Sequence, residues 1–145
     1  MKIGLSQRVF YHKGRAYDAI EHGWYSYLKN HTLTFVENRT DQDFQKLADS
    51  LDALIITGGD DSTLRRAVET KLARHILEFN KPIIGVCHGC FLLTHLLGGE
   101  IDETITHMDT SHSVYYFGEE HLVNSYHNLQ IKKPHLTATV LVVDP

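Results

Sequence analysis

The 145-residue chain has the composition of an ordinary folded protein, with 42% hydrophobic residues, 22% charged residues and a net charge of −4. This length suits one compact domain and is short for two, so we expect a single domain over residues 1–145. The acidic balance provides no basic surface for phosphate backbones, which argues against a nucleic-acid partner. No segment approaches the roughly 20 apolar residues that cross a bilayer, and the first residues lack a signal peptide's apolar run. We therefore expect no membrane partner and a cytoplasmic location.

In chain order, short β-branched apolar runs alternate with stretches of helical periodicity, which is typical of an α/β fold. The continuous apolar run 53–57 indicates a parallel strand buried on both faces, and Asp41 is the expected N-cap of a helix. The sequence thus predicts an open, mostly parallel sheet flanked by helices. The expected strands are Lys2 to Ser6, Thr32 to Val36, Ala53 to Thr57 and Ile83 to Val86, and the expected helices are Arg15 to Lys29, Asp41 to Leu51, Leu64 to Phe79 and Cys87 to Leu97.

Beyond the C-cap signal Gly98-Gly99 the pattern changes to short strands and loops. Three strands are predicted there, at Ser113 to Phe117, Leu122 to Asn124 and Thr137 to Val143. The chain ends on this last apolar strand and a turn signal, which is an odd place for a natural C-terminus. We therefore expect the domain to continue beyond Pro145.

Two cysteines, Cys87 and Cys90, are too few to staple a secreted mini-protein, and in a reducing compartment such thiols are more often catalytic or redox-active. The eleven histidines show no repeated metal-ligand spacing, so no metal site is expected.

Cys87 directly follows a buried strand and begins a helix, where open α/β sheets bind ligands. A helix N-terminus favours a thiolate and can receive an oxyanion, and the flanking Gly85 and Gly89 permit a tight turn. This pattern predicts that Cys87 is a nucleophile.

Other interpretations of the cysteines stay open. A lone cysteine on an apolar segment is usually a small buried hydrophobe. Cys87 and Cys90 also form a C-x-x-C pair, as in thioredoxin-like redox sites and zinc half-sites, although a closed zinc site needs two further ligands. If Cys87 is a nucleophile, Cys90 is expected to be a packing residue.

The Gly58-Gly59 loop follows the neighbouring strand and so opens on the same sheet edge as Cys87. Consecutive glycines let backbone N–H groups approach a ligand closely, whereas the simpler alternative is an ordinary turn. Together with the cysteine turn, the loop points to an anion-stabilising site at this edge.

These residues resemble the class I glutamine amidotransferase-like family. The matching landmarks, in order, are the strand and loop 55–61, the turn 82–89 around Cys87, the helix end 97–99, and the segment Val123 to His127, which is similar to an Asn-Ser-x-His segment on the substrate side. The resemblance spans essentially the whole chain. It is greatest to the free-standing γ-glutamyl hydrolase branch, because Tyr17-Asp18-Ala19-Ile20 followed by Trp24 is similar to a segment of that branch.

The resemblance implies that Cys87 attacks the γ-carbonyl of a γ-glutamyl amide or amidate, and that a γ-glutamyl thioester forms and is hydrolysed. It implies that the backbone N–H groups of Gly59 and His88 form the oxyanion hole. A small-molecule γ-glutamyl substrate and no cofactor are expected. Residues that the resemblance or their position suggests for substrate binding are Arg8, Ser125, Tyr126 and His127.

Two departures from the family pattern stand out. Phe91 occupies the position of a glutamine that frames the glutamyl group, which puts glutamine itself in doubt as the substrate. The family's late His-Pro-Glu segment, which supplies the catalytic base, does not occur before Pro145. We expect it beyond that residue, and His127 is the alternative base.

Competing functions also remain. The chain could be a glutaminase subunit that delivers ammonia to a synthetase partner, and such a subunit should need its partner for turnover. From another class, it could be an inactive ligand-binding relative or a redox protein that uses Cys87 and Cys90.

Overall fold

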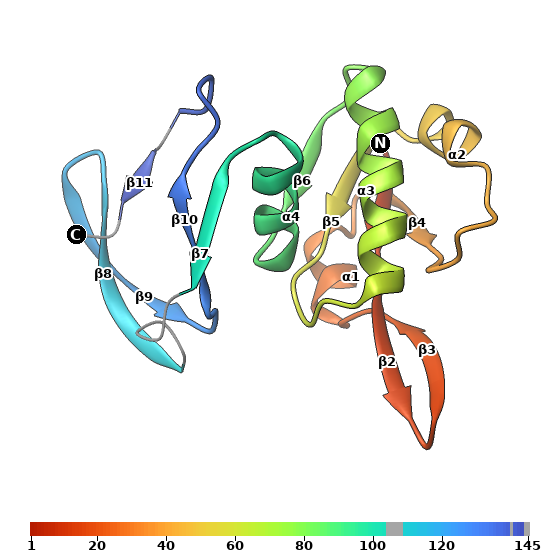
Figure 1. The fold of residues 1–145 in the computed structure, drawn as a ribbon, viewed down its shortest axis with the longest axis horizontal. Coiled ribbons are helices and arrows are strands. Elements are labelled where there is room, and N and C mark those ends of the chain that lie inside the picture. Colours follow the sequence, from red (N-terminus) through yellow and green to blue (C-terminus); the bar gives the residue numbers. More distant parts are fainter. Residues whose placement is uncertain (104–108, 140, 144–145) are drawn as a thin grey trace. The chain divides into compact units, whose positions relative to one another are not determined.

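The computed structural model describes residues 1–103, 109–139 and 141–143 (Figure 1). The chain divides into two compact units, Met1–Leu93 and Thr94–Pro145. The first unit is an α/β structure, and the second consists mainly of antiparallel strands. Among the described residues, no helix has both the length and the apolar character needed to span a membrane.

The first unit is built on four parallel strands, which confirms the predicted fold class. Their order across the sheet is β4 (Thr32–Val36), β1 (Lys2–Ser6), β5 (Ala53–Ile56) and β6 (Ile83–Gly85). Since all four run in the same direction, their carboxyl ends meet at one edge of the sheet. The segments that follow β1, β5 and β6 therefore emerge side by side at this edge, where α/β sheets bind ligands.

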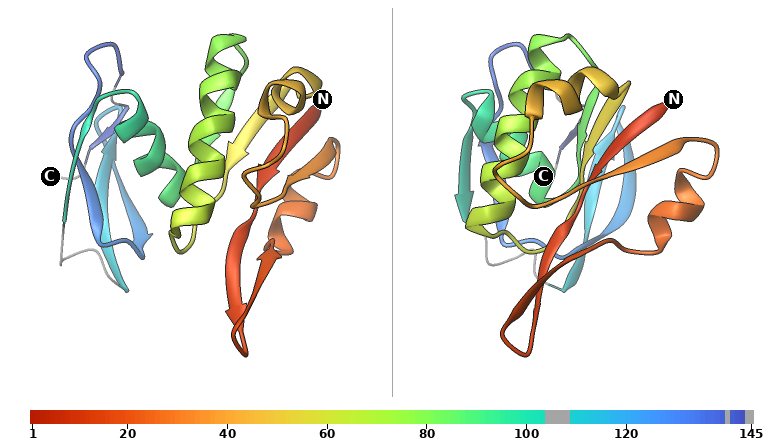
Figure 2. Two further views of the ribbon diagram at one scale, coloured as in Figure 1. Left: turned by 45° about the vertical axis from the view of Figure 1, so that its right-hand side comes forward. Right: turned by 90° about the vertical axis from the view of Figure 1, so that its right-hand side faces the viewer.

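Helices cover both faces of this sheet, with α3 (Thr63–Glu78) on one side and α1 (Gly23–Tyr27) on the other (Figure 2, right). The side chains of a strand alternate between its faces, and this divides the core into two layers. Helix α2 (Phe44–Ser50) packs beside α3. The α1 side of the core contains Ile3, Leu5, Leu28 and Ile55, with Ile20, Trp24 and Leu33 packed against them.

The expected helix from Arg15 to Lys29 is wrong over its first part, where the chain forms a β-hairpin. Strand β2 (Arg8–His12) pairs with β3 (Arg15–Ala19), and both residues of the connecting turn, Lys13 and Gly14, have positive φ, 48° and 72°. Such two-residue turns match the twist of a hairpin, and they prevail here over a weak helical periodicity. Only the short α1 remains of the predicted helix.

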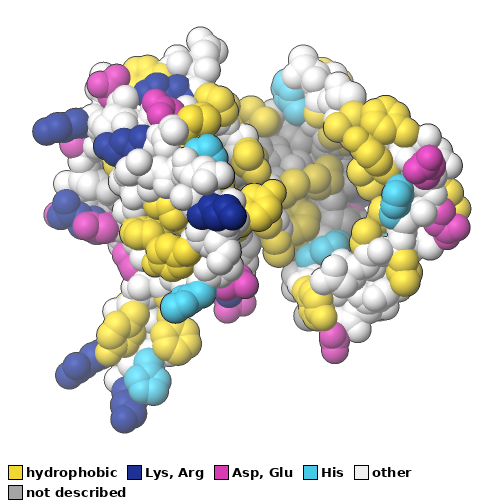
Figure 3. Space-filling model, turned by 180° about the vertical axis from the view of Figure 1, so that it is seen from behind, with side chains coloured by type: hydrophobic (Ala, Val, Ile, Leu, Met, Phe, Trp, Pro, Cys, Tyr) yellow, Lys and Arg dark blue, Asp and Glu magenta, His cyan; other side chains and the backbone are white. Residues whose placement is uncertain are grey.

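This β2–β3 hairpin projects from the first unit in both views of Figure 2. Its outer surface combines aromatic and basic side chains, visible at the lower left of Figure 3. Phe10 is 56% exposed and stacks on His12 with the ring planes 11° apart. Of the aromatic residues within the helix expected from Arg15 to Lys29, Tyr17 and Tyr27 are exposed, whereas Trp24 packs against the core.

The N-cap of α2 is Asp43, whereas the sequence had suggested Asp41. The Asp43 carboxylate accepts a hydrogen bond of 2.9 Å from the Lys46 backbone N–H. Asp41 lies further out, with its side chain 78% exposed and 3.7 Å from Arg39. Both aspartates come before the periodic apolar residues of α2, so the sequence allows either as the N-cap. The direction of the chain where it enters the helix decides that Asp43 is the cap.

This difference predicts unequal effects on stability. Asp43→Ala removes the cap and is expected to lower the free energy of unfolding by about 0.5–2 kcal/mol. Asp41→Ala is the matched control and should change it by less than about 0.5 kcal/mol, because it removes only an exposed ion pair. Urea unfolding of the two variants measures both values. Equal losses would contradict the assignment of Asp43 as the cap.

The described residues of the second unit form two small antiparallel sheets. In one, β7 (Glu100–Glu103) pairs with β10 (Leu129–Lys133); in the other, the order is β11 (Val142–Val143), β8 (Thr110–Tyr116) and β9 (Glu119–Ser125). The predicted strands at 113–117 and 122–124 fall within β8 and β9, apart from residue 117. The strand predicted from Thr137 to Val143 is wrong at 137–139 and at 141, and it is formed at Val142–Val143. Residue 140 lies outside the described residues.

Candidate active site

Cys87 lies in a tight turn between β6 and α4 (His88–Leu96), as its flanking glycines had indicated. Its φ is +51°, a region that residues other than glycine rarely adopt and that is common at functional sites. The turn leaves no room for larger neighbours. A Cβ on Gly89 would lie 2.3 Å from the Ile56 carbonyl oxygen, and one on Gly85 would lie 2.3 Å from the Gly89 carbonyl oxygen. The thiol is exposed and forms no disulfide.

The Gly58-Gly59 loop lies directly against this turn, as expected from the neighbouring strands. A Cβ on Gly58 would be 3.2 Å from the Cys87 Cβ and 4.0 Å from its Sγ. Gly59 has a φ of +103°, which only glycine adopts easily. The loop thus approaches the thiol so closely that a side chain on Gly58 would press against Cys87.

Arg8 also reaches this edge of the sheet. It begins β2, which a single residue separates from the end of β1, and its guanidinium packs on Gly59, since a Cβ there would lie 2.4 Å from Arg8 Nε. Its side chain is 42% exposed and its Nη2 is 3.5 Å from a Glu21 carboxylate oxygen. The positively charged guanidinium of Arg8 therefore lies beside the loop, with part of its surface accessible to a ligand.

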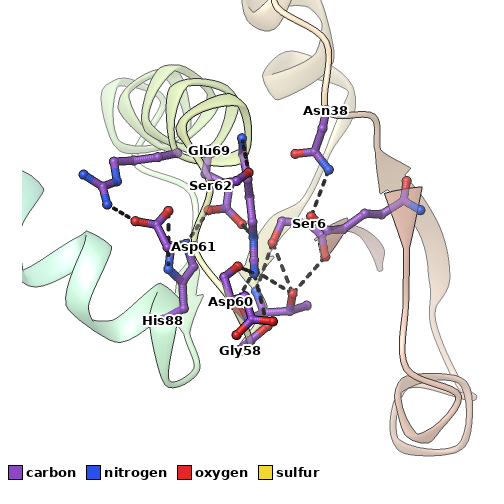
Figure 4. A network of polar contacts seen from close by, with 12 residues as sticks. Ser6, Asn38, Gly58, Asp60, Asp61, Ser62, Glu69 and His88 are labelled. Atoms are coloured by element: carbon purple, nitrogen blue, oxygen red, sulfur yellow. Dashed lines mark hydrogen bonds and ion pairs between the residues drawn. The ribbon is translucent and has the colours of Figure 1, made fainter. Parts of the chain in front are cut away.

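The ends of β1 and β5 are joined by hydrogen bonds between Ser6 and Thr57 (Figure 4). The Thr57 backbone N–H donates to Ser6 Oγ at 3.0 Å, and the Thr57 hydroxyl donates to the Ser6 carbonyl at 3.0 Å. Both residues are buried. These bonds fix the point at which the Gly58-Gly59 loop leaves the sheet.

A fully buried arginine holds the rest of this loop. Arg65, on the first turn of α3, donates to the carbonyl oxygens of Thr57 at 2.6 Å, Gly58 at 3.3 Å and Asp60 at 2.9 Å. A further bond of 3.0 Å reaches the Thr57 hydroxyl. One guanidinium thus satisfies three carbonyl groups of the loop that lies against Cys87.

Glu69 connects this arginine to the residue that follows Cys87. Its Oε1 accepts from Arg65 Nε at 2.8 Å, and its Oε2 accepts from His88 Nε2 at 2.8 Å. Arg65, Glu69 and His88 are 0%, 1% and 9% exposed. Because arginine stays charged, the buried carboxylate balances it, and the imidazole is held with Nε2 as the donor. Figure 4 shows the carboxylate between the loop and the start of α4.

Sequence reasoning did not identify Arg65 or Glu69. The signal was present, because they occupy two positions of the inward stripe of α3 that otherwise holds apolar residues. The buried positions of this helix are Arg65, Val68, Glu69, Leu72, Ala73 and Ile76. Two opposite charges four residues apart on such a stripe indicate a buried ion pair rather than a solvated face.

The predicted site residues fall into two groups. Cys87, Gly59, His88 and Arg8 are brought together at the sheet edge of the first unit. The other predicted residues belong to the second unit, and their assignment to the same site stays a prediction. They are Ser125, which ends β9 with its hydroxyl buried and without a hydrogen-bond partner among the described residues, the exposed Tyr126, and His127, whose Nδ1–H donates to the Leu129 carbonyl at 2.7 Å.

The family model and two curated relatives that match this chain are, by name, enzymes that act on glutamine or a γ-glutamyl compound. The family model described as glutamine amidotransferase class-I matches residues 16–143. A γ-glutamyl-CDP-amidate hydrolase from Campylobacter jejuni is 28% identical, over 92% of this chain and 73% of the relative. A glutamine-hydrolysing GMP synthase from Bacillus licheniformis is 29% identical, over 77% of this chain and only 20% of the larger enzyme.

Solved structures share the fold. A protein from Thermoplasma acidophilum, assigned to a GMP synthase, superposes with a TM-score of 0.72 at 19% identity, over 99% of this chain and 73% of that one. A glutamine amidotransferase from Thermotoga maritima gives 0.69 at 14% identity, over 97% of this chain and 66% of that one. Each of these chains is longer than the present one.

Proposed function

Since the chain belongs to the class I glutamine amidotransferase family, we propose that Cys87 is the nucleophile that cleaves a γ-glutamyl C–N bond. The family identifies the chain as a hydrolase of such bonds. One observation carries the assignment of Cys87: its exposed thiol sits in a positive-φ turn at a helix N-terminus, with the Gly58-Gly59 loop packed against it. This arrangement combines a reachable sulfur with backbone donors for a developing oxyanion.

The proposed reaction proceeds in two displacements. The Cys87 thiolate attacks the γ-carbonyl carbon, and the carbonyl electron pair moves onto the oxygen, which the N–H groups of Gly59 and His88 stabilise. The C–N bond then breaks, and the nitrogen leaves with the proton given up by the thiol. Water attacks the resulting γ-glutamyl thioester, the sulfur departs with one proton of the water, and glutamate is released.

We propose γ-glutamyl-CDP-amidate as the substrate, in bacterial capsule phosphoramidate synthesis. The similarity to the Campylobacter hydrolase over 92% of this chain supports this choice. Arg8, half open to solvent beside Gly59, suits an anionic leaving group, because a guanidinium pairs well with phosphate oxygens. Phe91 on α4 replaces the glutamine that frames glutamine in relatives, which also favours another γ-glutamyl compound.

A second function has its own support. The similarity to a glutamine-hydrolysing GMP synthase favours a glutaminase that passes ammonia to a synthetase partner. Partner dependence separates the two, since a hydrolase acts alone. For either activity, two cysteines outside disulfides fit a reducing compartment such as the cytoplasm.

Release of glutamate by the full-length protein tests the proposal. The substrates to compare are γ-glutamyl-CDP-amidate, glutamine and γ-glutamylmethylamide, without any partner. We expect the amidate to give the highest kcat/KM. Glutamine turnover that depends on an added synthetase would establish the ammonia-delivering glutaminase instead. Absence of turnover with all three, with no labelling of Cys87 by 6-diazo-5-oxonorleucine, would rule out both enzyme functions.

The base that takes the thiol proton is proposed to be a histidine beyond Pro145, as in the family pattern, with His127 as the alternative. His127 Nδ1–H donates to the Leu129 carbonyl, and this bond fixes the orientation of the ring. If the base lies beyond Pro145, His127→Asn in the full-length protein should lower kcat by less than about 10-fold, whereas loss of a general base costs about 10²–10⁴-fold. The pH profile of kcat/KM distinguishes the two assignments: its acidic limb, which reports protonation of the general base, is kept in His127→Asn if the base lies elsewhere and is lost if His127 is the base.

A further inference from the structure

We propose that Arg65 and Glu69 are positioning residues that hold the two backbone donors of the oxyanion hole in register with each other. The inference rests on the proposed function, in which the N–H groups of Gly59 and His88 stabilise the oxyanion. Neither Arg65 nor Glu69 needs to touch the substrate. They act through the loop after β5 and the turn after β6, which lie far apart in the sequence and meet only in the folded protein.

The peptide unit between Gly58 and Gly59 carries the first donor. A trans peptide is planar, so the Gly58 carbonyl and the Gly59 N–H point in opposite directions, and the described chain has no cis peptide bond. Arg65 Nη1 donates to this carbonyl at 3.3 Å from the interior of the unit. The Gly59 N–H is therefore directed away from the buried guanidinium, and Arg65 sets the orientation of the first donor.

The start of α4 carries the second donor. His88 is the first residue of this helix, and the first N–H groups of a helix have no intrahelical acceptor. Its side chain is anchored at 2.8 Å to Glu69 Oε2, and the other oxygen of the same carboxylate holds Arg65. Glu69 thus fixes His88, whose own N–H is the second donor, relative to the group that orients the first.

Both groups are mounted on one rigid element. Arg65 and Glu69 are four residues apart on the 16-residue helix α3, so they lie on the same face one turn apart. A buried ion pair is weak evidence for stability, because well-packed apolar residues often replace it without loss. Here, however, each end of the pair is bonded to a different half of the proposed oxyanion hole. The geometry therefore assigns the pair to positioning.

The test replaces both charges together in the full-length protein. Single variants would leave an unpaired buried charge and could unfold the protein, whereas Arg65→Met/Glu69→Leu removes both charges and keeps most of the volume. The matched control is Arg74→Met/Glu78→Leu, which has the same residue types and spacing on the exposed side of the same helix. The substrate is whichever of the three γ-glutamyl compounds the wild type hydrolyses best.

Two reactions of Cys87 then separate positioning from a general structural role. Acyl transfer passes through an oxyanion, whereas alkylation by iodoacetamide does not. We expect Arg65→Met/Glu69→Leu to lower kcat by about 100- to 1000-fold, as for loss of one oxyanion donor. Its KM and the rate of Cys87 alkylation should change by less than about threefold, and the control should match the wild type in all three.

Each other outcome is decisive. If the wild type is active and the double variant, with a retained melting temperature, keeps its kcat, the positioning role is wrong while the proposed function stands. The same holds if acyl transfer and alkylation fall together. If the double variant unfolds, Arg65→Lys is measured instead, because it keeps the opposite charge beside Glu69 but loses the guanidinium bonds to the loop carbonyls, and the same split between the two reactions is expected. A wild type that hydrolyses none of the substrates overturns the proposed function and this inference with it.

Discussion

Cys87→Ala is expected to abolish hydrolysis of the γ-glutamyl substrate, with a loss in kcat of roughly 10⁴–10⁶-fold, because the thioester cannot form without the sulfur. The variant should keep the wild-type melting temperature, since the side chain is exposed and small. Steady-state glutamate release, together with intact mass after treatment with 6-diazo-5-oxonorleucine, measures the effect. The wild type should gain one adduct and the variant none.

Cys90→Ala is the matched control, because Cys90 is also a cysteine and lies on the first turn of α4, only three residues after Cys87. A nucleophile hypothesis requires Cys87 alone, so this variant should keep its kcat within a few-fold and should still be labelled once. A C-x-x-C redox site would require both thiols. Equal loss of activity in the two variants would therefore disprove the single-nucleophile mechanism and favour the redox interpretation.

Gly89→Ala is expected to have the second largest effect, and it acts through packing. The added Cβ would lie 2.3 Å from the Ile56 carbonyl oxygen and 2.8 Å from the Ile56 Cβ. Ile56 belongs to the central strand β5 and is fully buried, so it cannot move aside. We expect a loss of about 1–3 kcal/mol in the free energy of unfolding. This corresponds to roughly 3–10 °C in Tm, and displacement of the turn should also remove most of the activity.

Gly23→Ala serves as the control for this glycine substitution. A Cβ on Gly23 would meet its nearest neighbour, a Glu21 carboxylate oxygen, at 3.6 Å, which is an ordinary contact. The residue begins α1, where alanine is at least as favourable as glycine. Its Tm should be unchanged or slightly higher. A Gly89→Ala protein as stable and active as this control would show that α4 does not need its close approach to β5.

The parallel sheet was largely predictable because its signals are local. The strands β1 and β4 occupy the residues expected, and the strands at 53–57 and 83–86 end only one residue early. The hairpin of β2 and β3 was missed, since its alternating residues also fit a helical face. A two-residue turn with positive φ at Lys13 and Gly14 decided between the two. Likewise, Asp41 and Asp43 are both suitable N-cap residues for α2, and the path of the chain at the start of the helix makes Asp43 the cap.

The sequence by itself determined that a cysteine follows a parallel strand and is flanked by two glycines, and that a Gly-Gly loop follows the neighbouring strand. The expected burial of the strand before the cysteine is wrong, because Ile84 in β6 is 57% exposed. Chain neighbours dictate these features, so pattern and spacing reveal them. Only the tertiary structure decided what holds the two segments together. Arg65 bonds the loop's carbonyl groups and Glu69 bonds His88, and these contacts join residues up to 19 positions apart. Such pairing depends on how α3 docks on the sheet, because a buried charge finds its partners only when packing excludes water around it.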